Sequence, residues 1–199
     1  MKNFISIERW LNEQKEEPYY GCVMLETQMR DWDDVHIGGI DDRDVFVKPL
    51  DDSFGLEKQP HMTVIFGIHE DDVDPEVIMS VIKENMEPVT VTVTSISIFE
   101  KEEYDVVKYD IPVTDQIDKY RQMFLDNFVN TQDFPEYHPH MTIAYVKPGE
   151  GKKYVSNLDE PFEVTFNKGV YSFHEKNDDG ELELLRKQHV FPKPEEYEI

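Results

Sequence analysis

The sequence predicts an α+β fold in which antiparallel sheets are flanked by helices. Three observations indicate it. Strand-like apolar runs recur along the chain, among them the alternating stretch Val89–Phe99, only two later segments carry the spacing of an amphipathic helix, and one tetrapeptide occurs twice. Hairpins with few helices favour this class over a doubly wound parallel sheet, and no dinucleotide-binding glycine fingerprint is present.

The first apolar run, from Tyr19 to Leu25, predicts a strand at the start of the core. The stretch 30–59 that follows is rich in Asp and Gly, and Val45–Val47 is its single strand-like part. We interpret it as a long loop. Loops of this length often form lids or binding segments, although an acidic run is also typical of a solvated surface.

A helix is predicted after the strand His61–Phe66, because Asp74 can cap its N-terminus and Pro75 suits its first turn. A second helix should open at Thr114 and carry an apolar stripe that ends at Phe128. The remaining apolar runs predict strands, the last two joined as a hairpin across Asn177–Gly180. These strands are Val89–Phe99, Tyr104–Ile111, Tyr137–Val146, Phe162–Phe173 and Leu182–Arg186.

The length of the chain limits its domain organisation, and its net charge limits the classes of partner that it can bind. With 199 residues the chain is long enough for one sizeable core, and we expect an N-terminal segment over 1–18, a single domain over 19–191 and a C-terminal tail over 192–199. The 43 acidic and 20 basic residues give a net charge of −23, which repels polyanions. Long duplex nucleic acid is therefore not expected as a partner, whereas a small anionic ligand in a locally positive pocket is.

The single cysteine, Cys22, cannot form an intrachain disulfide, which favours a reducing compartment. We expect it to have a packing role in its strand. The N-terminus lacks the pattern of a secretion signal, and no apolar stretch has membrane-spanning length. The sequence predicts a soluble cytoplasmic protein without a membrane partner, and its oligomeric state stays open.

The repeated word is the strongest functional signal. Pro60-His61-Met62-Thr63 recurs as Pro139-His140-Met141-Thr142, and an aromatic residue follows three positions after each threonine. On a strand, His61 and Thr63 share one face while Met62 points to the other. If two halves of the chain pack about a pseudo-twofold axis, the two His/Thr pairs face each other across one central cleft.

Two imidazoles in one cleft suit phosphodiester cleavage. One can remove a proton from the nucleophile and the other can protonate the leaving oxygen, since a histidine pKa of about 6.5 allows both states near neutral pH. Thr63 and Thr142 can donate hydrogen bonds to the phosphoryl oxygens. His61, Thr63, His140 and Thr142 are thus the candidate catalytic residues, with no metal or other cofactor required. Which histidine is the base stays open.

The double His-x-Thr arrangement resembles that of the 2H phosphoesterases, from Tyr19 to about Arg186. The resemblance implies a two-lobed fold with a central cleft and a metal-independent phosphodiesterase activity. Tyr137–Tyr145 looks most like the phage enzymes that destroy the cyclic nucleotide signals of CBASS-type antiviral immunity. That likeness implies hydrolysis of small cyclic nucleotides or cyclic oligonucleotides in the host cytoplasm. The 30–59 insertion is longer than in compact family members.

Several alternatives stay open. The chain could be an RNA 2′,3′-cyclic or 2′,5′-phosphodiesterase in RNA end processing, or a non-catalytic protein that sequesters a nucleotide. His61 and His140 could be structural, or His138 and His140 could bind a metal together with His69 or acidic residues.

Candidate substrate-binding residues are Tyr20, Tyr145 and Lys147, although strict alternation points Tyr145 away from the histidine face. The segment Gly149–Lys152 lacks the spacing of a phosphate-binding loop and predicts a turn.

Overall fold

The eight strands of the described part of the chain form one antiparallel sheet, in the order β6-β3-β4-β5-β2-β1-β7-β8. The structure, a computed structural model, describes residues 19–132, 136–177 and 179–192, so the predicted segment 1–18 lies outside the described residues. The strands are β1 Tyr20–Glu26, β2 His61–His69, β3 Val89–Glu100, β4 Asp105–Asp110, β5 His140–Val146, β6 Ser156–Phe166, β7 Lys168–Lys176 and β8 Leu182–Val190.

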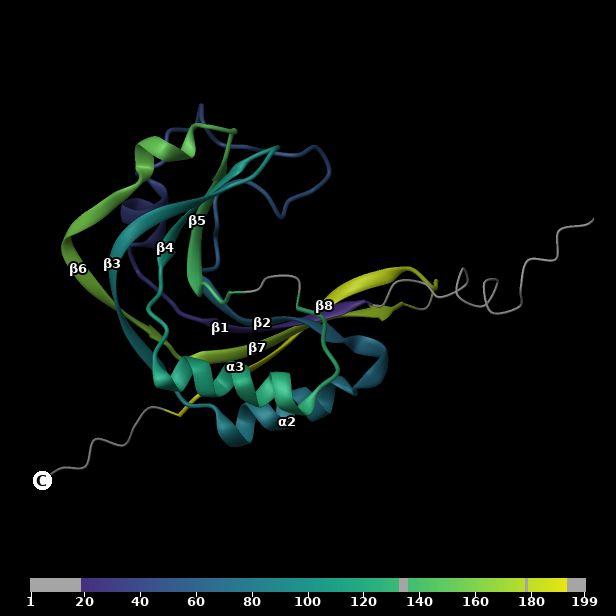
Figure 1. The fold of residues 1–199 in the computed structure, drawn as a ribbon. Coiled ribbons are helices and arrows are strands. Elements are labelled where there is room, and N and C mark those ends of the chain that lie inside the picture. Colours follow the sequence, from purple (N-terminus) through teal and green to yellow (C-terminus); the bar gives the residue numbers. More distant parts are fainter. Residues whose placement is uncertain (1–18, 133–135, 178, 193–199) are drawn as a thin grey trace, which may run out of the picture.

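The predicted α+β class with antiparallel strands and few helices is confirmed, but the strands make a single sheet and not two. Figure 1 shows β3, β4, β5 and β6 rising at a steep angle from β1, β2, β7 and β8. These two groups of four strands meet where β5 lies beside β2. The division into two lobes about a pseudo-twofold axis stays a prediction.

Both predicted helices begin at the predicted caps. Helix α2 spans Pro75–Asn85 and α3 spans Asp115–Asn127. The Asp74 carboxylate accepts a hydrogen bond from the amide of Glu76, and the Thr114 hydroxyl accepts one from the amide of Ile117, which satisfies amides that a helix start leaves unpaired. Both helices lie against the β1, β2, β7 and β8 group (Figure 1), α2 in contact with β7 and α3 in contact with β2.

The predicted strand Phe162–Phe173 is wrong as a single element. It is divided at Asn167, since β6 pairs with β3 while β7 pairs with β1. The chain thus passes directly from the edge of one strand group into the other. The predicted final hairpin is confirmed, with the amide of Asn177 donating to the carbonyl of Glu181 over 2.8 Å.

The stretch 30–59 holds one short helix, the π-helix η1 over Trp32–Ile37. Its Trp32 and Ile37 join the core, whereas Val35 is exposed. Val45–Val47 forms no strand and contributes a single bridge from Val45 to Val146. Two 3₁₀ turns complete the described elements, η2 over Glu70–Asp72 and η3 over Gly151–Tyr154. No helix within the described residues is both long and apolar enough to cross a membrane.

Candidate active site

The two repeated motifs meet at the junction of β2 and β5. The register joins these strands through one antiparallel pair, Met62 with Met141. In an antiparallel pair the residue before one partner lies opposite the residue after the other, so His61 lies beside Thr142 and Thr63 lies beside His140. Both methionines are fully buried. The structure therefore brings the four predicted residues together on one face, as expected from the strand phase.

Both histidine rings are oriented by the same contact. Nδ1 of His61 lies 2.8 Å from the carbonyl oxygen of Gln59, and Nδ1 of His140 lies 2.8 Å from the carbonyl oxygen of His138. A carbonyl oxygen can only accept a hydrogen bond, so Nδ1 carries the proton in each ring. This fixes the tautomer and leaves Nε2 of each imidazole for proton transfer.

His140 lies beside a buried cation. Lys108, which is 4% exposed, pairs across the strands with Thr142, and its Nζ donates to Asp110 Oδ1 over 2.6 Å and to Ser97 Oγ over 2.7 Å. The ring of Phe99 meets the His140 ring edge to face at 4.9 Å between centroids. Burial, followed by the positive charges of Lys108 and His61, lowers the pKa of His140 below its usual 6.5. His140 is therefore neutral at pH 7.

His61 lies among carboxylates. Its Nδ1 is 3.8 Å from Oε2 of Glu57, and Glu26 is its cross-strand neighbour. Glu26 is itself buried and neutralised by two cations, Lys168 at 3.0 Å and Arg186. Each histidine thus has an acidic cross-strand neighbour, Glu26 for His61 and Asp110 for His140, and each of these acids is paired with a cation.

Sequence reasoning did not identify these charged neighbours. A signal was present, because Glu26 ends the apolar run of β1 and Lys108 interrupts the apolar run of β4. A charged residue that is buried in a strand needs a partner. Glu26 finds Lys168 and Arg186 on strands that are distant in the sequence, whereas Lys108 finds Asp110 two residues away in its own strand.

The prediction that Tyr145 points away from the histidine face is wrong. The register of β5 against β4 skips Ile143, which is the extra residue of a β-bulge. Lys108 pairs with Thr142, and Val106, two residues earlier, pairs with Tyr145. Since paired residues of neighbouring strands share a face, the bulge turns Tyr145 to the histidine side.

The 30–59 insertion occupies the edge of β5 that β2 leaves free. The amides of Phe46 and Glu57 donate to the carbonyls of Tyr145 and Ile143 over 2.9 Å each, and the amide of Tyr145 donates to the carbonyl of Gly55 over 2.8 Å. An aromatic cluster also stabilises the contact between the insertion and β5. Contacting rings in this cluster have centroids 5.1–5.5 Å apart, and its members are Phe46, Phe54, Tyr104 and Tyr145.

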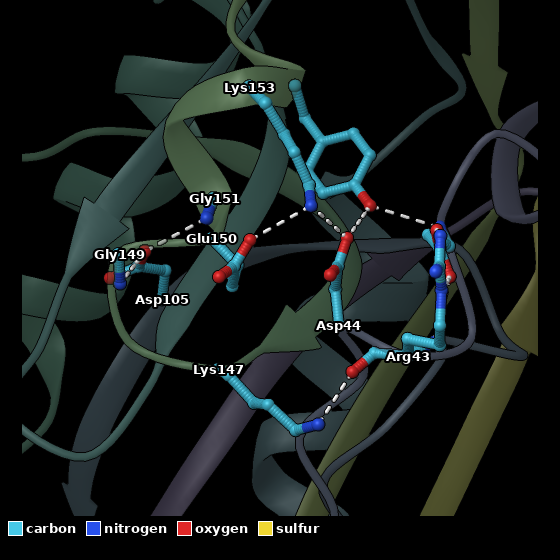
Figure 2. Close-up of polar contacts among 10 residues, drawn as sticks. Arg43, Asp44, Asp105, Lys147, Gly149, Glu150, Gly151 and Lys153 are labelled. Atoms are coloured by element: carbon cyan, nitrogen blue, oxygen red, sulfur yellow. Dashed lines mark hydrogen bonds and ion pairs between the residues drawn. The ribbon is translucent and has the colours of Figure 1, made fainter.

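The middle of this insertion, at Arg43 and Asp44, is tied to the chain after β5 by an ion pair and a hydrogen bond (Figure 2). Nζ of Lys153 lies 2.6 Å from Asp44 and 2.9 Å from Glu150, and Nζ of Lys147 donates to the carbonyl of Arg43 over 2.6 Å. Lys147 is therefore an anchor of the insertion, and it is not among the described residues that line the pocket beside His61.

A pocket of about 1200 Å³ opens beside His61. One wall is the stretch from Val45 to Gln59, and the other is formed by residues of β1, β7 and β8. Tyr145 lines this pocket, and its role in binding a substrate stays a prediction. The residues of the strand wall are Met24, Ser172, Leu184 and Arg186.

Tyr20 lies at the end of β1 that is remote from His61, where it pairs with His69 of β2, and its ring lies 6.1 Å from that of Phe66.

Cys22 lies in β1, and its thiol approaches the Thr63 hydroxyl at 4.0 Å. Burial raises the pKa of the Cys22 thiol to about 12, so this group stays protonated and is no nucleophile.

The alternative of a metal site gains no geometric support, and the segment Gly149–Lys152 was predicted to be a turn. His69, a proposed metal ligand, bonds the Thr131 hydroxyl at the end of β2 remote from His61, and no three His, Cys, Asp or Glu within the described residues are placed to hold a metal ion. The amides of Gly149 and Gly151 both donate to the Asp105 carboxylate, over 2.9 and 3.0 Å (Figure 2), so this turn binds the chain's own anion.

Comparison with known proteins identifies relatives at the level of sequence family and fold. A family model described as "2′-5′ RNA ligase superfamily" matches residues 48–170, more than half of the chain and both motifs. No curated protein matches the sequence. The crystal structure of E. coli LigT complexed with 3′-AMP has a TM-score of 0.52 at 11% identity, covering 89% of this chain and 100% of that chain. A crystal structure of a phosphoesterase has a TM-score of 0.46 at 12% identity, covering 88% of this chain and 100% of that chain. The first of these likenesses shows a LigT-like α+β fold.

Proposed function

The chain belongs to the 2′-5′ RNA ligase superfamily of 2H phosphoesterases, and on this premise we propose that it is a metal-independent phosphodiesterase that cleaves a small nucleotide. The observation that carries the proposal is the meeting of two His-x-Thr motifs at the pair Met62–Met141, with both rings bonded through Nδ1 to a backbone carbonyl. Two Nε2 atoms then face one site, as acid/base catalysis of a phosphodiester requires.

His140 is the base in this proposal. A base must begin without a proton, and burial together with the nearby Lys108 charge holds the pKa of His140 below 6.5. The acid role then falls to His61, because cleavage needs one group of each kind. Thr63 and Thr142 lie on the same face and donate to the phosphoryl oxygens as their charge grows in the transition state.

A 3′,5′ linkage is cleaved by attack of the neighbouring ribose 2′-hydroxyl on phosphorus. His140 Nε2 takes the proton of the ribose 2′-hydroxyl while that oxygen bonds to phosphorus. The bond from phosphorus to the 5′ oxygen breaks, and His61 Nε2 gives its proton to the leaving 5′ oxygen. A 2′,3′-cyclic phosphate results, and a water molecule can open it with the two histidines in exchanged roles.

The substrate proposed is a small cyclic nucleotide or cyclic oligonucleotide. The net charge of −23 disfavours a long polyanion, and the E. coli protein of similar fold was crystallised with 3′-AMP, a small nucleotide. The finer assignment, that the substrate is a 3′,5′-linked cyclic dinucleotide of antiviral signalling in the host cytoplasm, rests on the likeness of Tyr137–Tyr145 to phage enzymes of this kind.

A substrate panel tests the proposal. The purified full chain is incubated in EDTA with a 3′,5′-linked cyclic dinucleotide, with an RNA that ends in a 2′,3′-cyclic phosphate, and with a 2′,5′-linked dinucleotide. We expect turnover of the cyclic dinucleotide at a rate that EDTA does not change. Turnover of the RNA end or the 2′,5′ linkage alone would assign the chain to RNA processing, and binding without turnover would make it a nucleotide-sequestering protein. Activity that EDTA abolishes and a divalent ion restores would overturn the metal-independent mechanism.

A further inference from the structure

The repeat begins before its proline. A glutamate stands four positions before each histidine, so the sequence reads Glu57-Lys58-Gln59-Pro60-His61 in the first copy and Glu136-Tyr137-His138-Pro139-His140 in the second. In both copies Nδ1 of the histidine is bonded to the carbonyl of the residue two positions earlier. The two glutamates therefore hold matching positions in the sequence, but the structure gives them different surroundings.

Glu57 is folded against the site. Its side chain is 19% exposed, and its Oε1 accepts a hydrogen bond from the amide of Gln59 over 2.8 Å. The carbonyl of Gln59 in turn accepts a hydrogen bond from Nδ1 of His61 over 2.8 Å. Gln59 is thus held at its amide by Glu57 and holds the His61 ring with its carbonyl.

The Glu57 carboxylate acts on the ring through Gln59 and not by direct contact. Oε2 of Glu57 lies 3.8 Å from Nδ1 of His61, which is longer than a hydrogen bond. Nδ1 can donate one proton, and the carbonyl of Gln59 accepts it. The orientation of the ring therefore depends on the place of this carbonyl, which the carboxylate helps to fix.

The backbone of residue 57 is fixed independently of its side chain. Its amide donates to the carbonyl of Ile143 in β5 over 2.9 Å, and its carbonyl accepts from Nε1 of Trp32 in η1 over 2.7 Å. At the other end of the segment, the carbonyl of Pro60 accepts from the amide of Thr27 over 3.2 Å. The carboxylate thus extends from a fixed point, and a substitution of the Glu57 side chain leaves these three contacts in place.

Glu136 lies in a different environment. Its side chain is 79% exposed, and its Oε2 lies 3.3 Å from Nε2 of the His138 ring, which is itself 61% exposed. A solvated contact of this kind contributes little energy. The second copy of the repeat therefore supplies a matched control for the first.

We propose that Glu57 is a positioning residue for His61, whereas Glu136 has no such role for His140. By holding Gln59, Glu57 keeps a proton on Nδ1 of His61 and directs Nε2 to the phosphate as the atom that gives up its proton. The 30–59 insertion, which contains Glu57 and Gln59, thereby orients a catalytic ring. The kinetic consequence rests on the proposed phosphodiesterase function, but the tautomer of His61 does not.

Nitrogen NMR of the histidine rings tests the positioning without a substrate. The full chain is prepared with isotope-labelled histidine, and the His61 signals are identified by their loss in His61→Ala. At alkaline pH, where imidazoles are neutral, we expect the wild-type ring to carry its proton on Nδ1. Glu57→Met should shift it toward the mixed tautomers of a free imidazole. Glu57→Gln keeps an acceptor oxygen and should preserve the wild-type tautomer, as should Glu136→Met.

Steady-state kinetics measure the consequence on a substrate that the wild type cleaves. Glu57→Met should lower kcat about 10²-fold, the effect of a misplaced catalytic group. KM should stay within about twofold, because Glu57 acts on the ring and not on the substrate. Glu57→Gln should recover most of kcat, and Glu136→Met should keep it. Melting curves confirm that each variant is folded, and Glu57→Ala removes the same oxygens without the bulk of methionine.

The inference would be overturned by a wild-type His61 that carries its proton on Nε2, or by folded Glu57→Met and Glu57→Ala proteins with the wild-type tautomer and kcat. An equal loss of kcat in Glu57→Gln and Glu57→Met, or in Glu57→Met and Glu136→Met, would also overturn it. In these cases the proposed function stands. A wild type that cleaves no substrate of the panel would instead overturn the proposed function, and the tautomer measurement would still test the positioning of His61.

Discussion

Val64 in β2 and Ile143 in β5 are each the extra residue of a β-bulge that follows directly after a His-x-Thr motif. Val64 is skipped in the pairing with β1, and Ile143 is skipped in the pairing with β4. Each bulge moves the aromatic residue three positions after the threonine to the histidine face. The repeat is thus a repeat of backbone geometry as well as of residue types, and bulges beside an active site commonly re-aim side chains in this way.

The threonine hydroxyls are expected to act in the transition state. Thr63→Val and Thr142→Val keep the shape of the side chain and remove the donor, so each should lower kcat by roughly 10²–10³ with little change in Tm. Steady-state kinetics and a melting curve measure both. Thr90→Val is the control, because Thr90 is an exposed strand threonine on β3 that bonds Thr165. A threonine variant that keeps the wild-type kcat would remove that hydroxyl from the mechanism.

Lys108 and Asp110 should shift the pH profile in opposite directions. A base with a lowered pKa stays neutral to lower pH, so the acid limb of kcat/KM set by His140 should lie below pH 6.5. Lys108→Met removes a positive charge and should move this limb upward, whereas Asp110→Asn removes a negative charge and should move it downward. Profiles from pH 4.5 to 8.5 measure both shifts. Shifts of the same sign, or none, would contradict the assignment of His140 as base.

The lowered pKa of His140 also makes folding depend on pH. Below pH 6.5 the unfolded chain binds a proton at this residue that the folded chain does not bind, so the contribution of His140 to stability falls as the pH drops. His140→Gln should remove that dependence. Urea unfolding at pH 5.5 and pH 7.5 measures it, and an unchanged difference between the two pH values in the variant would show that other groups cause it.

Gly67 is expected to be essential for the second bulge of β2. Its φ is 99°, and a Cβ there would lie 2.1 Å from the carbonyl oxygen of Thr131. Gly67→Ala should therefore cost more than Gly180→Ala, where φ is 80° but no atom lies within 4 Å and the cost is only the ~1–2 kcal/mol of a left-handed alanine. Free energies of unfolding in urea compare the two, and equal losses would contradict the steric argument.

The features that sequence alone predicted are local. Asp74 and Thr114 cap helices because of residues within three positions, and the phase of His61 and Met62 follows from strand alternation. The features that it missed depend on partners far along the chain. The side on which Tyr145 lies is set by pairing with β4, and the division at Asn167 occurs because β6 and β7 pair with different strands.

The roles of the charged neighbours of the histidines also could not be predicted from local sequence. Glu26 and Lys108 were visible as charges within apolar runs, but their roles depend on strands that no local pattern specifies.

The central claim is that His61 and His140 act as one acid/base pair without a metal. Its most direct test is the rate of nucleotide cleavage in EDTA for His61→Ala, His140→Ala and the double variant. His138→Ala serves as the control, since it removes a ring that is 61% exposed and keeps the carbonyl that His140 contacts. We predict that each single variant loses about 10³-fold or more, that the double variant loses no more than the worse of them, and that the control keeps its rate. A single variant that retains the wild-type rate would contradict the claim.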